Sequence, residues 1–130
     1  SATKLQTARN INGVSFDGSA DITVPAAALS INAQTGTTYT LVLTDASKLV
    51  TLDNASAITL TVPPNSSVAF PTGTVVEGAQ LGAGQVTIAE GSGVTVNGNP
   101  GLIVSGQYSP FALIKTDTNT WLAVGQLVDS

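Results

Sequence analysis

The chain has 130 residues, a formal net charge of -4, and only 9% charged residues against 42% hydrophobic ones. This length fits a single domain with its own core, and the high apolar content combined with a small net charge excludes a disordered, solvated coil. Its four basic residues are too few for affinity to a nucleic-acid backbone, no apolar run approaches the roughly 18 residues of a membrane span, and the absence of Cys and His excludes disulfides and thiol or imidazole chemistry.

The first predicted element is a short N-terminal hairpin element within residues 2–24, ATKLQTARNINGVSFDGSADITV. Apolar and polar residues alternate there, and the pairs Asn12-Gly13 and Asp17-Gly18 favour tight turns. Pro25 and the small residues after it predict a connector. We therefore divide the chain into residues 1–28 and a β domain of residues 29–130, and since Met is absent we expect a fragment of a longer protein.

The motifs ATKL, TAR, INGV and FDGSADI in this stretch closely resemble a segment that recurs along the tail fibres and related adhesion proteins of tailed bacteriophages. The later runs NAQTGTTYTLVLTDASKLVTLDN and LGAGQVTIAEGSGVTVNG resemble the β-rich domain that follows such segments in phage structural proteins. The resemblance implies a homotrimeric shaft or its junction with a globular head, with other virion tail proteins as partners. It also implies a location in the virion after assembly in the host cytoplasm.

The next part of the chain alternates strongly and predicts strands at residues 38–44, 48–52 and 57–62. Alternation places Tyr39, Leu41 and Leu43 on one face of the first of these strands. Two Pro-containing loops then flank Phe70, and isolated aromatic residues usually provide packing. We interpret Phe70 as an anchor that holds a loop against the core.

The rest of the chain predicts short strands at residues 68–70, 74–77, 85–89, 94–96, 102–104, 107–115 and 120–127. We expect a hairpin across Glu90–Gly93 and a last hairpin loop at Thr116–Asn119. Many short strands at roughly 8–12-residue spacing, without a helical stripe, predict an all-β antiparallel sandwich or jelly-roll-like domain. Homotrimer formation would hide several edge strands of such a domain.

Catalysis is not expected, because only carboxylates are available as general acids or bases. A glycosidase needs two carboxylates facing one sugar, whereas most of these lie in predicted turns, where Asp is favoured for local hydrogen bonds. Asp17 and Asp21 flank a turn that lacks the later ligands of a calcium loop. We expect no catalytic residue, no cofactor and no metal, although a carboxylate pair formed across subunits stays an open alternative.

The candidate binding residues are Tyr108, Asp117, Asn119 and Trp121. Aromatic faces cover the apolar side of a pyranose, while Asp and Asn side chains bind its hydroxyls. Asp117 and Asn119 lie in the loop just before Trp121, so these three form the centre of the predicted sugar site. The competing interpretation is that the lone Trp is a core or interface anchor.

Parity along the last two strands separates their faces. One strand places Phe111, Leu113 and Lys115 together, and the next sets Trp121 and Ala123 against the alternate residues, Leu122 and Val124. The function expected from the whole sequence is a non-enzymatic structural and adhesion module of a phage tail fibre that binds a host surface polysaccharide through several weak sites. The alternatives are a purely structural collar, shaft or trimerisation module, and a polysaccharide depolymerase.

Overall fold

The computed structural model describes residues 9–11, 14–16 and 28–129 of the chain. Within these residues the secondary structure consists of β-strands and turns, with one short 3-10 helix and no α-helix. The prediction of an all-β fold is therefore confirmed for the part of the chain that the structure describes.

The N-terminal ribbon consists of β1 (Arg9–Ile11) and β2 (Val14–Phe16), which pair antiparallel with Ile11 opposite Val14. This pairing confirms the strands of the first predicted hairpin. A two-residue Asn-Gly connection suits the tight turn that such a hairpin needs. The second predicted turn, at Asp17-Gly18, lies outside the described residues. The division of the chain at residues 28 and 29 stays a prediction.

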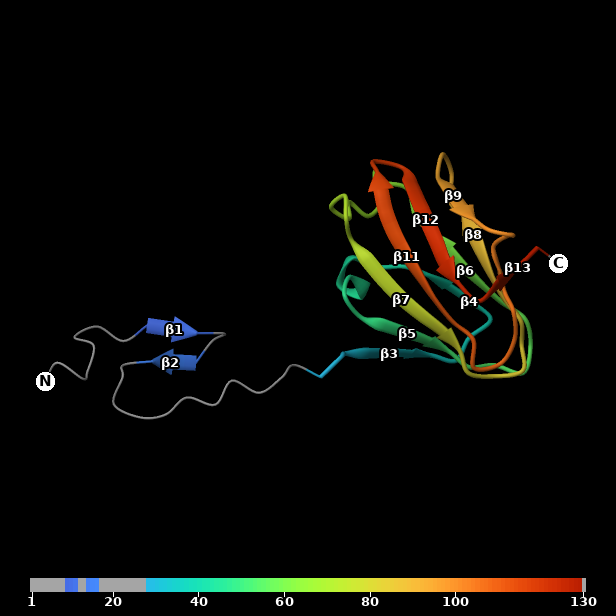
Figure 1. Cartoon of the computed structure of the whole chain (residues 1–130), viewed down its shortest axis with the longest axis horizontal. Helices are drawn as coiled ribbons and strands as arrows, with labels where there is room; N and C mark the ends of the chain where they lie inside the picture. Colours follow the sequence, from blue (N-terminus) through green and yellow to red (C-terminus); the bar gives the residue numbers. More distant parts are fainter. Residues whose placement is uncertain (1–8, 12–13, 17–27, 130) are drawn as a thin grey trace, which may run out of the picture.

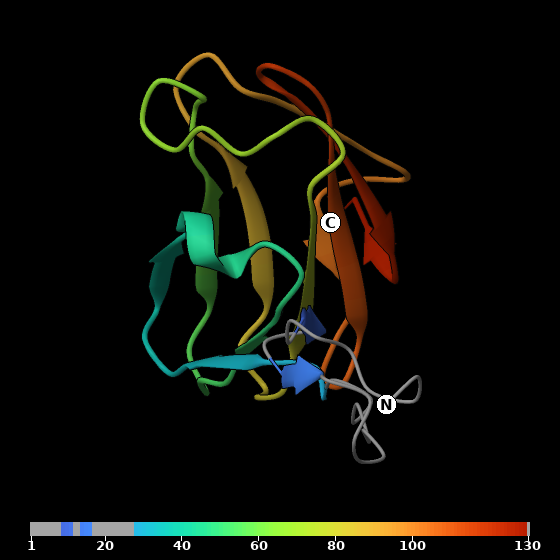
Figure 2. The same ribbon diagram turned by 90° about the vertical axis from the view of Figure 1, so that its left-hand side faces the viewer.

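The remaining strands form two β-sheets that face each other, as the two views in Figure 1 and Figure 2 show. One sheet has six strands in the order β3-β5-β7-β11-β12-β9, and the other has five in the order β13-β10-β8-β6-β4. In chain order the elements are β3 (Ile31–Gln34), β4 (Thr38–Thr40), η1 (Leu43–Asp45), β5 (Leu49–Leu52), β6 (Ile58–Val62), β7 (Val75–Gln80), β8 (Val86–Glu90), β9 (Thr95–Gly98), β10 (Ile103–Val104), β11 (Pro110–Asp117), β12 (Thr120–Gly125) and β13 (Leu127–Val128).

The first half of this body winds like a solenoid. From β3 to β8 successive strands alternate between the two sheets, and each strand from β3 to β6 pairs in parallel with the strand two places later. One coil therefore contributes one strand to each sheet, and β3 with β4 forms the first coil. The prediction of antiparallel pairing is wrong for these strands, because the chain crosses to the opposite sheet after each strand instead of reversing beside it.

The corners of the coils stack closely on one another. The Asn54 side chain donates to the carbonyl oxygen of Thr35 in the first corner, and the Asn54 carbonyl accepts from the Gly84 amide in the third. A Cβ atom at Gly84 would lie 2.5 Å from the Asn54 carbonyl oxygen, and one at Gly82 would lie 2.6 Å from the Asn54 nitrogen. Glycine is needed here because the backbones approach too closely for a side chain.

The second half is mainly antiparallel. β11 pairs antiparallel with β7 and β12, and β10 pairs antiparallel with β8 and β13, whereas β9 pairs in parallel with β12. The prediction of a hairpin across Glu90–Gly93 is wrong, because β8 and β9 lie in different sheets. The last predicted hairpin is confirmed, since Asp117 pairs with Thr120 across a tight connection.

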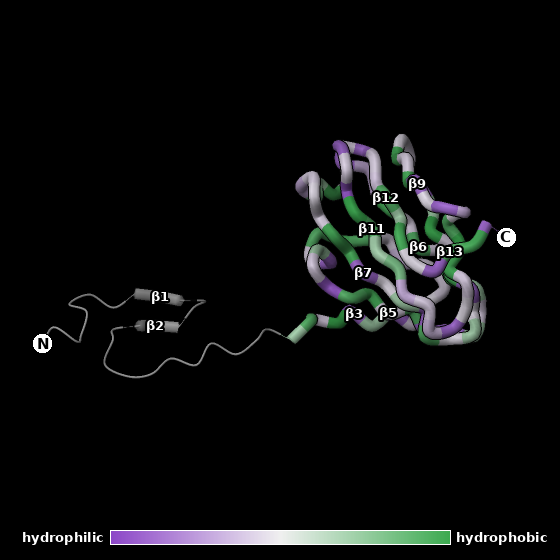
Figure 3. The backbone as a smooth tube through the Cα atoms, viewed as in Figure 1, coloured by the Kyte–Doolittle hydropathy of each residue, from purple (hydrophilic) through white to green (hydrophobic). Residues whose placement is uncertain are grey.

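The core lies between the two sheets, and Figure 3 shows hydrophobic residues along the strands of both sheets. The expectation that Phe111, Leu113 and Lys115 share one face of β11 is confirmed, and their burial shows that this face is the inward one. Phe70 is also buried, as predicted for an anchor, although no strand forms at residues 68–70. The buried apolar residues are Leu41, Val50, Leu52, Ile58, Leu60, Val62, Phe70, Val76, Val86, Ile88, Val94, Val96, Val104, Phe111, Leu113, Trp121, Ala123 and Leu127.

The strand predicted at residues 38–44 ends early, at Thr40. The buried carboxylate of Asp45 accepts hydrogen bonds from the backbone nitrogen of Val42 at 2.9 Å and from the Tyr39 hydroxyl at 2.6 Å. These bonds turn the chain into η1, so that Leu43 points outward instead of joining Leu41 in the core. A side chain that binds the local backbone has overridden the strand pattern.

Candidate functional site

The Trp121 side chain lies in the core and does not present a ring face to solvent. It is 1% exposed, and its ring meets that of Phe70 edge to face, with centroids 5.4 Å apart and an angle of 87° between the planes. Such pairs add stabilisation beyond the area that they bury. The expected sugar platform at Trp121 is therefore corrected, and the competing interpretation as a core anchor fits the structure.

The other three predicted site residues do not converge either. Tyr108 is exposed just before β11, whereas Asp117 ends β11 and Asn119 follows in the turn. A strand of this length separates its ends by about 25 Å. Asp117 accepts from the backbone nitrogen of Thr118 within its own turn, whereas Asn119 accepts from that of Asn65 and links this turn to the Pro-containing loop. Asp117 and Asn119 thus share one turn, while Tyr108 lies at the other end of β11 and Trp121 in the core.

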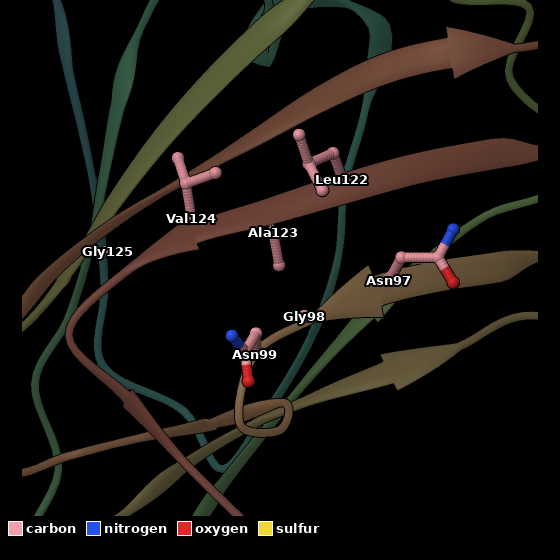
Figure 4. A pocket seen from close by; sticks show the side chains of 7 residues that line it. All are labelled: Asn97, Gly98, Asn99, Leu122, Ala123, Val124 and Gly125. Carbon is pink, nitrogen blue, oxygen red and sulfur yellow. The ribbon is translucent and has the colours of Figure 1, made fainter.

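A groove instead lies beside β12, on the six-stranded sheet, with a volume of about 370 Å³. It forms because β9 ends at Gly98, opposite Ala123, whereas β12 continues to Gly125. The chain leaves the sheet at Asn99 and uncovers the last residues of β12. The residues that line the groove, shown in Figure 4, are Asn97, Gly98, Asn99, Leu122, Ala123, Val124 and Gly125.

The groove combines an apolar floor with two carboxamides and has no charged lining residue. Leu122 and Val124 project from the same side of β12, and Asn97 and Asn99 lie on either side of Gly98 (Figure 4). Both apolar side chains are well exposed. A carboxamide donates and accepts hydrogen bonds at once, as a sugar hydroxyl requires of its partners. This chemistry suits an uncharged, hydroxylated ligand.

A second hollow of about 270 Å³ adjoins the groove and shares Val124 and Gly125 with it. It runs across β11 toward β5, and Glu77 is the one carboxylate that lines either hollow. The two hollows together follow the outer face of the six-stranded sheet. A ligand longer than one sugar could extend from the first hollow into the second.

Asp45 is the centre of a buried hydrogen-bond network in the first coil. Besides Val42 and Tyr39, it accepts from the side-chain nitrogen of Asn32 at 2.8 Å. Burial, together with the hydrogen bond and the negative charge of Asp45, raises the pKa of Tyr39 to about 12. The carboxylate is satisfied by donors from β3, β4 and η1, so its role is to join these elements.

Lys115 points into the core from β11 and is 2% exposed. Its amine donates to the Asn65 side-chain oxygen at 2.7 Å and to the Phe70 carbonyl oxygen at 2.6 Å. Both acceptors are uncharged, and burial lowers the pKa of the amine. Lys115 thus ties the Pro-containing loop to the sheet, and it holds Phe70 against Trp121.

Among residues 9–11, 14–16 and 28–129 there is no group of three or more Asp or Glu residues placed to hold a metal ion. In the same part of the chain, no helix has the length and apolar character needed to span a membrane.

Sequence reasoning missed the groove residues Asn97 and Asn99, which lie between the strands predicted at residues 94–96 and 102–104. Parity did indicate that Leu122 and Val124 share a face, but it did not show that this face is the outer one or that β9 stops beside it. The available signal was the pair of Asn residues around Gly98, which is common in turns without any binding role.

Comparison with known proteins identifies no relative. No family model, no curated protein and no solved structure matches the chain.

Proposed function

We propose that the chain is a non-enzymatic structural and adhesion module of a phage tail fibre, which binds a host cell-surface glycan through weak sites repeated in a homotrimer. The observation that carries the glycan part is the uncharged groove beside β12, with its two carboxamides and exposed aliphatic floor. The fibre part rests on the resemblance of residues 2–24 to tail-fibre segments.

In this proposal the apolar face of a pyranose lies on Leu122 and Val124, and its hydroxyls bind the side chains of Asn97 and Asn99. An open groove without aromatic rings gives weak affinity for one sugar. Three copies that engage a repetitive polysaccharide together would compensate through effective concentration. The small number of charged residues suits a hydrogen-bonding surface better than electrostatic capture.

The first alternative is a purely structural collar, shaft or trimerisation module. It is favoured by the absence of any aromatic side chain from the groove lining. The lower alternative, a polysaccharide depolymerase, needs two carboxylates at one sugar. Glu77 is the single carboxylate that lines the two hollows, so a second would have to come from another subunit.

The test compares binding to polysaccharide from susceptible bacteria for the native chain and for the double variant Asn97→Ala with Asn99→Ala. We expect at least a tenfold loss of binding in the variant, because two of its hydrogen-bonding groups are removed. Thr87→Ala, which removes an exposed polar group from β8 in the other sheet, is the matched control and should bind normally.

Equal binding by all three proteins would reject the groove as the glycan site, and no binding by the native chain would favour the structural alternative. Light scattering at micromolar concentration and after dilution tests the trimer separately. A mass of one or two chains at every concentration would contradict it.

A further inference from the structure

The first coil ends both sheets at the same side of the molecule. β3 is an edge strand of the six-stranded sheet, and β4 is an edge strand of the five-stranded sheet. Within the part of the chain that the structure describes, no strand pairs with the outer side of either. Among the described residues, the outer sides of β3 and β4 are therefore unpaired.

The register shows which backbone groups face the opening. The Ser30 and Gln34 carbonyls accept from β5 and the residue after it, so Ile31 and Ala33 direct their N–H and C=O groups away from β5. By the same alternation, Thr37 and Leu41 bond toward β6, and Thr38 and Thr40 face outward. Two short rows of hydrogen-bonding groups thus lie side by side.

The exposed surface around these two edges is apolar, and the charged Asp45 next to it is buried. Residues 28–44, ALSINAQTGTTYTLVLT, contain no charged side chain. Leu29, Ile31, Val42 and Leu43 are all well exposed there, with Ile31 at 63%. Natural edge strands are usually protected by Lys, Pro, a bulge or a covering segment. Neither β3 nor β4 contains a Lys, a Pro or a β-bulge.

The opposite end of the molecule is protected. The Val96 amide of the edge strand β9 donates to the Glu90 carboxylate at 2.7 Å, which occupies its hydrogen-bonding group and places a charge at the edge. The other edge strand, β13, has only two residues. The edge strands β9 and β13 are thus protected, whereas β3 and β4 lack these forms of protection.

We propose that the first coil is a self-association surface, and that a second copy of this chain binds it edge to edge. Around a two-fold axis β3 would pair antiparallel with β3 of the partner, Ile31 facing the partner's Ala33, and β4 would pair likewise with the partner's β4. Each outward-facing residue then gains hydrogen bonds, and both sheets continue across the contact.

This surface is complementary to itself, which favours a second copy of the chain over another protein. Each molecule carries a net charge of -4, but a contact through residues 28–44 brings no like charges together. The exposed apolar residues of the two copies would also cover one another. If the chain also forms a trimer through another face, the first coil stays free in that trimer, and pairing through it gives six chains. Without such a trimer, the same pairing gives two chains.

The experiment measures the mass of the full chain by light scattering, for the native protein and for the double variant Ala33→Pro with Thr38→Pro. Proline removes the outward N–H at each position, and the ladders to β5 and β6 do not use these groups, so the variant should keep its fold. We expect the native mass to correspond to two or six chains and the variant mass to be half of it.

The matched control is Ala33→Val with Thr38→Val, which alters the same positions but keeps both amides, and it should retain the native mass. Circular dichroism and thermal unfolding verify that each variant is folded. A native mass of one or three chains would overturn the proposal, and so would a folded proline variant with the native mass. If the double variant fails to fold, the single variant Thr40→Pro provides the same comparison at the β4 edge.

Discussion

At the scale of single residues, the core depends on a few side chains whose neighbours leave no freedom. Trp121 and Phe70 pack edge to face, and Lys115 holds the carbonyl of Phe70 in place. Gly78 lies under the ring of Phe111 on the neighbouring strand. The ring fills the space that a side chain at position 78 would need. Changes at these positions should affect stability more than binding.

Trp121→Ala should lower the free energy of unfolding by about 3–5 kcal/mol, because it removes a large buried ring and leaves a cavity. Urea unfolding measures this loss. Trp121 is the single Trp of the chain, so its emission in the native protein should also be poorly quenched by acrylamide. Ready quenching, or a loss below about 1 kcal/mol, would show that the ring is not in the core.

Gly78→Ala should destabilise the chain by about 1–3 kcal/mol, the usual range for overpacking. A Cβ atom there would lie 2.6 Å from Cε2 of the Phe111 ring, and that ring is buried and cannot easily move aside. Gly36→Ala is the control, since its Cβ would have no atom nearer than 3.7 Å. Similar thermal unfolding of the two variants would contradict this explanation.

At the scale of elements, two titratable residues join segments that pack against each other. Lys115 ties the Pro-containing loop to β11, and Tyr39 ties β4 to η1 through Asp45. Burial shifts their pKa values in opposite directions, downward for Lys115 and upward to about 12 for Tyr39. The pH dependence of stability should therefore change sign in the alkaline range.

Burial lowers the pKa of the Lys115 amine in the folded chain from its usual value of 10.5. Between the lowered pKa and pH 10.5, the Lys115 amine therefore keeps its proton in the unfolded chain and loses it in the folded one. Stability should rise with pH through this interval. Between pH 10 and 12 the unfolded chain loses the Tyr39 proton while the folded chain retains it, so stability should fall. We expect a maximum near pH 10 in urea unfolding measured from pH 7 to pH 12.

Two variants separate these contributions. Lys115→Met should flatten the rise, whatever its effect on stability at neutral pH, and Tyr39→Phe should reduce the fall. If stability still rises with pH in Lys115→Met, other titratable groups cause the rise. A fall of unchanged steepness in Tyr39→Phe would do the same for the alkaline side.

At the scale of the whole molecule, the two sheets present three different surfaces. The outer face of the six-stranded sheet carries the groove, and the far end is protected by Glu90. The first coil has unpaired edge strands within the described residues and no charged side chain in residues 28–44. The proposed glycan site and the proposed self-association surface thus lie in separate parts of the fold. The groove variants and the proline variants should act independently, because they share neither residues nor strands.

The sequence by itself determined the local features of this protein. Alternation identified most strands and grouped Phe111, Leu113 and Lys115 on one face, and Asn12-Gly13 indicated the first hairpin. These predictions succeed because side-chain direction in a strand depends only on parity, and a tight turn depends on two residues. Alternation could not predict where β4 ends, because this depends on Asp45, whose carboxylate accepts hydrogen bonds from side chains of β3 and β4.

Only the tertiary structure decided which strands pair. Parallel pairing of β3, β5 and β7 joins segments far apart in the chain, and it depends on corners that stack through Asn54 and Gly84. The same choice buries Trp121, opens the groove where β9 stops at Gly98, and leaves the first coil uncovered within the described residues. A period of two residues specifies a strand and its faces, whereas its neighbours are set by long-range packing that no local pattern contains.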